Sequence, residues 1–563
     1  MPDAPVLLIV DDDPQGRGVV ESELRKRYGA DYEIICVGSA DDPIRLLAKL
    51  RDDQRRVSIV LAGQTMSQLT GTELLTRVRE FDSTAKRLLL PDWRYRPPPE
   101  PILQAIALDH IDAYADRPAT VPDEEFHLAV TELLREWAKS NLPRPEVMQV
   151  VGKEWSARSH EIRDLLSRNV ISFGFYPAET QAGKALLEQA GAAAARLPVV
   201  IMFDGRVLED PSNTQLAEAI GMRTSPGADL YDVAVIGAGP AGLAAAVYGT
   251  SEGLSTVVLE PEAIGGQAGT SSRIRNYLGF PNGVSGEDLA LRAYTQAWNF
   301  GVDYIYGNPA TGLRVKGPER VVAVAGGSEI RSRAVVIATG VSYRRLGIPS
   351  LDALTGAGVF YGAAASEAKA MKGREVFVVG GANSAGQAAV HLARYAATVT
   401  MLVRGQSLAD SMSEYLVKEI TSTPNIVVRR GAAVTGGAGS GRLESLTLQD
   451  QASGVTETVP AAALFVLIGA EPRTQWLPDE VRRDRWGFVV TGTDLMAGGH
   501  PPDGWPLQRP PMLLESSVPG VFAVGDVRCG SVKRVASAVG EGSVAIQLLH
   551  QLFDATDPPP RGQ

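Results

Sequence analysis

The sequence predicts a multidomain α/β protein. At 563 residues the chain is too long for one hydrophobic core. Apolar strands such as residues 6–10 and 57–61 alternate with helical patterns such as residues 71–80, an order typical of doubly wound sheets. Glycine-rich turns that begin at Gly237 and Gly380 each join a strand to a helix. We therefore expect several parallel sheets, two of them of the Rossmann-like type.

The composition excludes several classes of function. Hydrophobic residues make up 44% of the chain and the net charge is −10, which argues against nucleic-acid binding as the main function. The first residues lack the pattern of a signal peptide, and no apolar run of about 18 residues could span a bilayer. We expect a cytoplasmic protein with no nucleic-acid or membrane partner.

Cysteine is scarce in this chain. Cys36 and Cys529 are the only two. This number excludes a disulfide framework, a cysteine-based zinc site and an iron–sulfur cluster, and the spacing excludes a Cys-x-x-Cys redox centre. We expect no metal site.

Two linkers divide the chain. Residues 141–145 and 223–228 are short and rich in proline or glycine. They separate a first domain, 1–140, from a second, 146–222. From residue 229 onward the chain is rich in glycine and alanine and repeats the β-α-β pattern.

The first glycine turn predicts a dinucleotide site. An apolar strand leads into Gly237-x-Gly239-x-x-Gly242, and an alanine-rich helix follows. Such glycines let the backbone approach a pyrophosphate, and the helix start supplies unpaired N–H groups. The next strand ends at Glu260, whose carboxylate can accept hydrogen bonds from a ribose hydroxyl. The alternative is a plain glycine turn, which this combination of features disfavours.

Further motifs indicate which dinucleotide binds. They are Gly265-Gly266-Gln267, Asn276-Tyr277-Leu278-Gly279-Phe280-Pro281, Ala338-Thr339-Gly340 and Gly525-Asp526-Val527-Arg528. In order and spacing they resemble the low-molecular-weight thioredoxin reductase family over about residues 229–550. The resemblance implies an FAD-binding domain of residues 229–343 and 465–563, an NAD(P)-binding domain of residues 344–464, and a homodimer.

The resemblance also implies which residues bind FAD. They are Gly237, Gly239, Pro240, Ala241, Gly242, Glu260, Gly266, Gln267, Asn276, Thr339, Gly340, Gly525, Asp526, Lys533, Arg534 and Val535. Asp526 would hold the ribityl chain. A helix that begins near Ser531 would direct its positive end at the flavin ring.

The second glycine turn predicts a nicotinamide-dinucleotide site that departs from the family pattern. The expected ligands are Gly380, Gly381, Asn383, Ser384, Ala385 and Arg404. Ala382 places a methyl group where the family has glycine. In the family, a His-Arg-Arg sequence at this point binds the 2′-phosphate of NADPH. This chain has only Arg404 there. We expect NADPH or NADH to bind, with NADPH slightly favoured; the alternative is a domain kept only as a scaffold.

The redox-active cysteine pair of that family is missing. Its positions fall at Ala363 and Ser366, or one residue earlier at Gly362 for the first, and its neighbouring acid falls at Glu367. Neither alanine nor serine can form a thiolate or a mixed disulfide. The usual thioredoxin reductase activity is therefore not expected.

These features predict an FAD-dependent NAD(P)H oxidoreductase. Electrons would pass directly from the flavin to a non-disulfide acceptor such as oxygen, a quinone, free flavin, a ferredoxin-like protein or a small molecule. Tyr361, Glu367 and Arg534 are the candidate catalytic residues, although ordinary packing and surface roles are equally expected for the first two. The alternative function is a flavin-binding regulatory or redox-sensing scaffold without turnover.

Residues 1–140 resemble a flavodoxin-like response-regulator receiver. Asp11 and Asp12 match the acidic pair that holds Mg²⁺, but the phosphoacceptor position is Gly63 and the lysine position is Arg117. Glycine cannot accept a phosphoryl group, so we interpret the domain as a pseudo-receiver. Asp11 and Asp12 could still bind a cation, but solvated surface side chains are the favoured interpretation.

Residues 146–222 resemble a thioredoxin or glutaredoxin fold. Trp155-Ser156-Ala157-Arg158-Ser159 has the outline of Trp-Cys-x-x-Cys, with serine for both cysteines. Leu197-Pro198 matches the cis-proline of that fold. Both N-terminal domains could dock a regulatory partner or a protein electron acceptor.

Overall fold

The structure is a computed structural model that describes residues 4–39, 42–82, 84–91, 102, 105, 110–118, 122–142, 145–169, 171–271, 274, 276–280, 283–361, 368–440 and 442–556. The chain forms two compact units. The first comprises residues 1–145 and 413–424, and the second comprises residues 146–412 and 425–563. Within the described ranges, no helix combines the length and the apolar character needed to cross a membrane.

The first unit is built on a parallel sheet. Its strands, in spatial order, are β2 (Glu33–Val37), β1 (Val6–Val10), β3 (Val57–Gly63), β4 (Lys86–Leu90) and β5 (Ala113–Tyr114). This is the flavodoxin-like order of doubly wound sheets. The helices of this unit are α1 (Pro14–Tyr28), α2 (Pro43–Asp52), α3 (Gly71–Phe81), α5 (Glu124–Asn141) and α15 (Glu414–Ser422).

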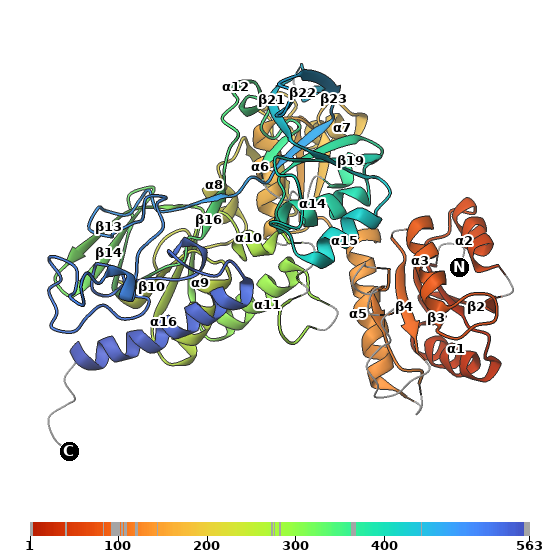
Figure 1. Ribbon diagram of the computed structural model, residues 1–563, viewed down its shortest axis with the longest axis horizontal. Coiled ribbons are helices and arrows are strands. Elements are labelled where there is room, and N and C mark those ends of the chain that lie inside the picture. The colour runs from red at the N-terminus through yellow and green to blue at the C-terminus, as the bar shows by residue number, and fades with distance from the viewer. Residues whose placement is uncertain are drawn as a thin grey trace. The chain divides into compact units, whose positions relative to one another are not determined.

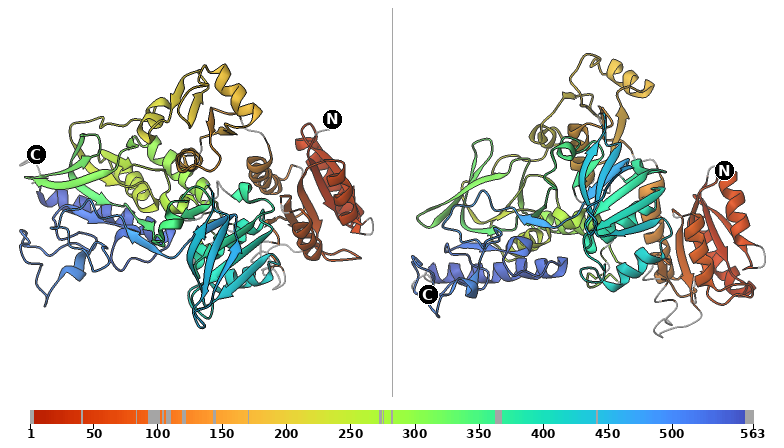
Figure 2. Two further views of the ribbon diagram at one scale, coloured as in Figure 1. Left: turned by 90° about the horizontal axis from the view of Figure 1, so that it is seen from above. Right: turned by 45° about the horizontal axis from the view of Figure 1, so that its top comes forward.

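Helices cover both faces of this sheet (Figures 1 and 2). Apolar residues of α1 and α5 form one core with the sheet, and those of α2 and α3 form another. Because both faces are covered, β1 and β3 are apolar along almost their whole length.

A small mixed sheet opens the second unit. Its strands, in spatial order, are β7 (Phe173–Pro177), β6 (Met148–Gly152), β8 (Val199–Met202) and β9 (Val207–Glu209). Strands β6 and β7 are parallel, whereas β8 is antiparallel to both β6 and β9. Its helices are α6 (Ala157–Arg168), α7 (Gln181–Gln189) and α8 (Asn213–Ala219). The peptide bond between Leu197 and Pro198 is cis, which confirms the prediction.

The third sheet carries the first glycine turn. Its strands, in spatial order, are β12 (Asp303–Tyr306), β11 (Thr256–Glu260), β10 (Tyr231–Ile236), β15 (Glu329–Ile337), β14 (Glu319–Val324) and β13 (Ala310–Lys316), and β26 (Val521–Ala523) also pairs with β15. Its helices are α9 (Pro240–Ser251), α10 (Gly266–Gly269), α11 (Gly286–Asn299) and α16 (Val535–Thr556), with short 3-10 turns η3 (Gly492–Leu495) and η4 (Gly525–Val527). Helix α16 lies alongside α9 and shares its apolar core (Figure 1).

Two connecting strands, β16 (Val341–Tyr343) and β25 (Ala470–Pro472), lead to and from a second Rossmann-like sheet. Its parallel strands, in spatial order, are β17 (Val359–Tyr361), β24 (Ala463–Val466), β18 (Glu375–Val379), β19 (Thr398–Val403) and β20 (Ile426–Arg430). An antiparallel sheet of β21 (Ala432–Ala438), β22 (Ser445–Asp450) and β23 (Thr456–Pro460), helices α12 (Pro349–Asp352) and α14 (Asn383–Ala393), and turn η2 (Lys369–Met371) complete this part.

Candidate functional site

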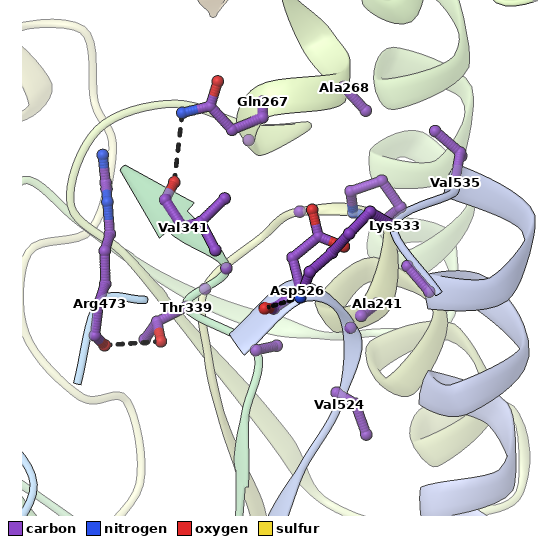
Figure 3. A pocket seen from close by; sticks show the side chains of 18 of the residues that line it. Ala241, Gln267, Ala268, Thr339, Val341, Arg473, Val524, Asp526, Lys533 and Val535 are labelled. Atoms are coloured by element: carbon purple, nitrogen blue, oxygen red, sulfur yellow. Dashed lines mark hydrogen bonds between the residues drawn. The ribbon is translucent and has the colours of Figure 1, made fainter. Parts of the chain in front are cut away.

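A cavity of about 230 Å³ lies where the carboxyl ends of β10, β11 and β15 meet the starts of α9 and α16 (Figure 3). The carboxyl edge of a parallel sheet is the usual ligand-binding edge of such folds. Of the residues predicted to bind FAD, all except Gly242 and Asn276 line this cavity. The structure therefore brings together motifs that lie up to hundreds of residues apart in the sequence.

The glycines of the first turn have different roles. Gly237 has φ +108°, and a Cβ there would lie 2.5 Å from the Ala338 carbonyl oxygen. A Cβ at Gly242 would lie 1.9 Å from the Gly237 carbonyl oxygen, so Gly242 lets α9 pack on the turn and does not form the cavity wall. Gly239 has no neighbour within 4 Å of such an atom, which leaves its backbone open to a ligand.

Glu260 is the last residue of β11 and lies beneath the turn. Its carboxylate accepts hydrogen bonds from the backbone N–H groups of Ala238, at 2.7 Å, and of Glu262 and Ala263, at 2.9 and 3.0 Å. Burial raises its pKa, which these hydrogen bonds oppose. The carboxylate therefore orders the turn as well as lining the cavity.

The start of α16 differs from the expectation. The helix begins at Val535 instead of near Ser531. The Lys533 ammonium group donates hydrogen bonds to the Asp526 carbonyl oxygen and to the Ser531 hydroxyl, at 2.9 Å for the latter, and these hold the preceding residues in a turn. Burial raises the pKa of Asp526 and lowers that of Lys533, while each charge opposes the shift of the other.

Sequence reasoning missed an ionic cluster in the cavity wall. The Glu262 carboxylate forms ion pairs with the guanidinium groups of Arg473, at 2.6 Å, and of Arg168, at 3.3 Å. Arg168 also donates to the Gly266 carbonyl oxygen at 3.4 Å. Because Arg168 ends α6, this cluster joins that helix to the segment that follows β11. In the sequence, the cluster is signalled only by Asp164 and Arg168, which are four residues apart and so share one face of α6. Many surface helices have such a pair.

Side chains on the opposite wall are held by backbone carbonyl groups. The Gln267 side-chain amide donates a hydrogen bond to the Val341 carbonyl oxygen at 3.3 Å. The Thr339 hydroxyl donates one to the Arg473 carbonyl oxygen at 2.9 Å (Figure 3). These bonds tie the cavity wall to β16 and to the residue that follows β25.

The predicted nicotinamide residues lie at the carboxyl ends of β18 and β19. Gly380 has φ +144°, and a Cβ there would lie 2.4 Å from the Leu467 carbonyl oxygen. Ala382 occupies the N-cap of α14 without a side-chain hydrogen bond. Arg404 is exposed just after β19, and Ser384 lines the cavity described above.

The candidate catalytic residues separate in the structure. Arg534 lines the first cavity, whereas Tyr361 lines a second cavity of about 420 Å³. The Tyr361 hydroxyl donates to Asp352 at 2.7 Å, and burial together with this bond raises its pKa to about 12. Ala363, Ser366 and Glu367 lie outside the described residues.

Neither cysteine lines either cavity. Cys36 lies in β2 of the first unit, where burial and the neighbouring Glu21 raise its pKa to about 12. The Cys529 thiol donates to Asp484 at 3.6 Å, and burial and that carboxylate raise its pKa. Raised pKa values keep both thiols protonated and weakly nucleophilic.

The acidic pair of the first unit differs from the expectation of solvated side chains. Asp11 is fully buried and forms an ion pair with Arg117 at 2.9 Å. Asp12 is half-buried; although burial opposes it, hydrogen bonds from Ser39 and Ser67 lower its pKa. A Cβ at Gly63 would lie 2.7 Å from the Asp11 Cγ atom. In the described part of the chain, no group of three His, Cys, Asp or Glu side chains could hold a metal ion.

The serine pair lies at the start of α6. Ser156 caps this helix, and its hydroxyl donates to that of Ser159 at 2.8 Å. A Cβ at Gly152 would lie within 3.1 Å of both the Ser159 hydroxyl and the Pro198 Cβ atom, so serine and cis-proline lie at one end of the sheet. The guanidinium group of Arg374 lies 5.3 Å from the Trp155 ring, which places this end against the second Rossmann-like part.

Known proteins resemble this chain over its C-terminal part. Thioredoxin reductase of Bacillus subtilis (strain 168) is 31% identical over 333 residues, which cover 56% of this chain and 93% of that protein. The crystal structure of Lactococcus lactis thioredoxin reductase in its FR conformation matches 58% of this chain and 99% of its own, with a TM-score of 0.52 and 25% identity. That of T. acidophilum thioredoxin reductase matches 59% and 100%, with a TM-score of 0.52 and 26% identity.

Residues 231–542 match the family described as pyridine nucleotide-disulphide oxidoreductase. This range includes both glycine turns and nearly all the residues that line the first cavity. The chain therefore belongs to the pyridine nucleotide-disulphide oxidoreductase family, which uses FAD and NAD(P)H.

Proposed function

We propose that the protein is an FAD-dependent NAD(P)H oxidoreductase that transfers electrons to a non-disulfide acceptor. One observation carries this proposal: the first cavity has the residues of an FAD site, whereas both thiols of the chain lie outside it and have raised pKa values. A disulfide relay needs a thiolate beside the flavin, and this chain supplies none.

The residues of the cavity fit FAD. The open backbone at Gly239 can approach a pyrophosphate, and the start of α9 directs N–H groups toward it. Glu260 and Asp526 offer carboxylate oxygens to hydroxyl groups of the ribose and the ribityl chain. When bound, FAD supplies the two-electron carrier between NAD(P)H and the acceptor.

The second glycine turn and Arg404 would hold the nicotinamide dinucleotide. Arg404 is exposed beside this turn and offers one cation to a 2′-phosphate. The Tyr361 phenol, with its raised pKa, stays protonated at neutral pH and donates its proton to Asp352, so at the edge of the second cavity it cannot act as a base.

Anaerobic rapid mixing of the FAD-loaded protein with NADPH or NADH tests the proposal. We expect the flavin absorbance near about 450 nm to bleach within seconds. In Arg404→Gln, the KM for NADPH should rise about tenfold while that for NADH changes little, because only NADPH carries the 2′-phosphate. Absence of bleaching with both nucleotides would contradict the proposal.

The non-disulfide part of the proposal has its own test. The relatives described above are named thioredoxin reductases, so disulfide reduction is the natural competing activity. We expect no NADPH-dependent reduction of a small aromatic disulfide or of thioredoxin above the rate of Cys529→Ser. Reduction by the purified chain without a second thiol protein would contradict this part.

A flavin-binding scaffold without turnover is the second candidate. The methyl group of Ala382 at the start of α14 and the single cation Arg404 favour it, because both weaken a nicotinamide site. Full FAD content combined with no bleaching by either nucleotide would support the scaffold and exclude the oxidoreductase.

We also propose that the protein is a cytoplasmic homodimer and that its N-terminal domains, a pseudo-receiver and a cysteine-free thioredoxin-like domain, contact a protein partner. The flavodoxin-like strand order and the glycine at position 63 support the assignment of the first domain, and the serine pair supports that of the second. Sedimentation at several protein concentrations tests the dimer, and a monomer at all of them would contradict it.

A further inference from the structure

The second cavity adjoins the first and is shared by three parts of the second unit. Its volume is about 420 Å³, within the range of small-molecule sites. Residues that line both cavities are Arg168, Glu262, Gln267, Tyr343 and Arg473. One face of α6 supplies a further part of the wall, and the end of β17 supplies another. A ligand in the second cavity would therefore lie next to the flavin site.

Among the described residues, the charges that line this cavity leave Arg345 without an ion-pair partner. Arg168 and Arg473 both contact Glu262, and Arg168 also lies 3.5 Å from Asp164. These two carboxylates balance two guanidinium groups. The guanidinium group of Arg345 lies 5.1 Å from the centre of the Tyr361 ring. The described lining thus carries an excess of one positive charge, located on Arg345.

A second donor in the wall lacks a partner. The Nε–H group of Arg168 is buried and has no hydrogen-bond acceptor among the described residues. Because this atom has no accessible surface, Arg345, whose side chain is exposed, is the guanidinium group that can receive an anionic ligand.

The rest of the wall is aromatic. Phe360 and Tyr361 line the cavity from β17, and the His160 ring of α6 packs on Phe360 with 5.1 Å between ring centres. Tyr343 forms the boundary with the first cavity. Aromatic walls favour a flat conjugated ligand, because rings pack well on rings.

We propose that the second cavity binds the electron acceptor and that this acceptor is an anionic quinone, a flat ring that carries a sulfonate, carboxylate or phosphate group. This inference rests on the proposed function, which it makes more specific. NAD(P)H would supply two electrons and one proton, and solvent the second proton. The two quinone carbonyl groups would become hydroxyl groups as NAD(P)H becomes NAD(P)⁺.

Binding is tested without turnover. Isothermal titration of the FAD-loaded protein with anthraquinone-2-sulfonate is compared with titration of neutral 2-(hydroxymethyl)anthraquinone. Arg345→Gln should weaken binding of the sulfonate about tenfold and leave the neutral ring unchanged, as expected for one charge-assisted contact. Asp164→Asn, which removes a negative charge from the wall, should tighten binding of the sulfonate by about two- to threefold.

Arg344→Gln is the matched control, because Arg344 adjoins Arg345 in sequence but pairs with Glu471 and does not line the cavity. It should bind both rings as the unchanged protein does. Equal affinity of the unchanged protein for the two rings, or an unaltered sulfonate affinity in Arg345→Gln, would overturn the inference. Failure of NAD(P)H to bleach the flavin would overturn the proposed function instead, and the titration would still report on the cavity.

Discussion

The Tyr361 hydroxyl donates a 2.7 Å hydrogen bond to the Asp352 carboxylate, which joins the end of β17 to the end of α12. Of the candidate catalytic residues that the structure describes, Tyr361 borders the second cavity and Arg534 lines the first. The Tyr361 phenol proton is therefore directed at a neighbouring carboxylate and away from a transfer role.

Tyr361→Phe should lower the free energy of unfolding by about 1 kcal/mol, because Asp352 loses a hydrogen bond. The folded pKa of about 12 exceeds the ordinary value of 10.0, so the bond is fully stabilising below pH 10.0 and is lost as the pH rises through 12. Hydrogen exchange of β17 measures the change. The pH profile of flavin reduction should be the same in both proteins across the neutral range. A pKa in that range that disappears in the variant would identify the phenol as a proton donor and contradict this view.

Gly239→Ala should fold normally and lose FAD affinity by about tenfold or more, because the methyl group meets no protein atom within 4 Å but occupies the approach of the pyrophosphate. The FAD-to-protein absorbance ratio after gel filtration measures the loss, and the melting temperature of the FAD-free protein should not change. Gly237→Ala is the contrasting variant: its positive φ and the Ala338 carbonyl group at 2.5 Å should destabilise the FAD-free protein itself. Full FAD retention by Gly239→Ala would show that the ligand does not reach this backbone.

Glu262→Gln should reduce the hydrogen-exchange protection of α6 by about 1 kcal/mol at neutral pH. The effect is small because the Glu262 side chain is 40% exposed, and solvent screens its ion pairs. Burial works to raise the pKa of Glu262, but Arg473 and Arg168 outweigh it and lower the pKa below 4.5. The ionic contribution is therefore complete above pH 4.5 and is lost as the pH falls, so the two proteins should converge in acid. Glu471→Gln, which removes a more exposed pair with Arg344, is the control and should have almost no effect. A difference that persists at low pH would contradict an ionic role for Glu262.

Gly63→Ala should destabilise the first unit by about 1 to 3 kcal/mol, because the new methyl group would lie 2.7 Å from Asp11 and 2.9 Å from the Arg117 guanidinium group. Gly18→Ala, in the exposed middle of α1 with no neighbour within 4 Å, should stabilise by about 0.5 to 1 kcal/mol. Hydrogen exchange of β1 and α1 reports both changes. If both substitutions changed the free energy of unfolding in the same direction, contact with the Asp11–Arg117 ion pair would not explain the effect of Gly63→Ala.

Local patterns predicted the elements well because they depend on short stretches of sequence. Residues 6–10 form β1 as expected, and the turn at Gly237 lies between β10 and α9. Element ends were less accurate: the helix expected to begin near Ser531 begins at Val535, because Lys533 holds the preceding residues in a turn.

Contacts between distant segments could not be predicted. Arg168 and Glu262 are 94 residues apart, and nothing in either sequence neighbourhood selects the other. Burial of Asp11 was missed for the same reason, since its partner Arg117 is 106 residues away. The motifs thus meet at the first cavity, whereas the ionic wall of this cavity and the second cavity follow only from tertiary packing.

The hydrogen bond between Ser156 and Ser159 has a consequence for how the protein responds to oxidants. Hydroxyl groups at these positions neither form nor break a covalent bond when the surroundings change from reducing to oxidising. The start of α6 therefore contains no bond that oxidants would make or break, and the far end of the same helix contacts Glu262 through Arg168. A change between reducing and oxidising surroundings thus has no covalent route through this helix to the wall that the two cavities share.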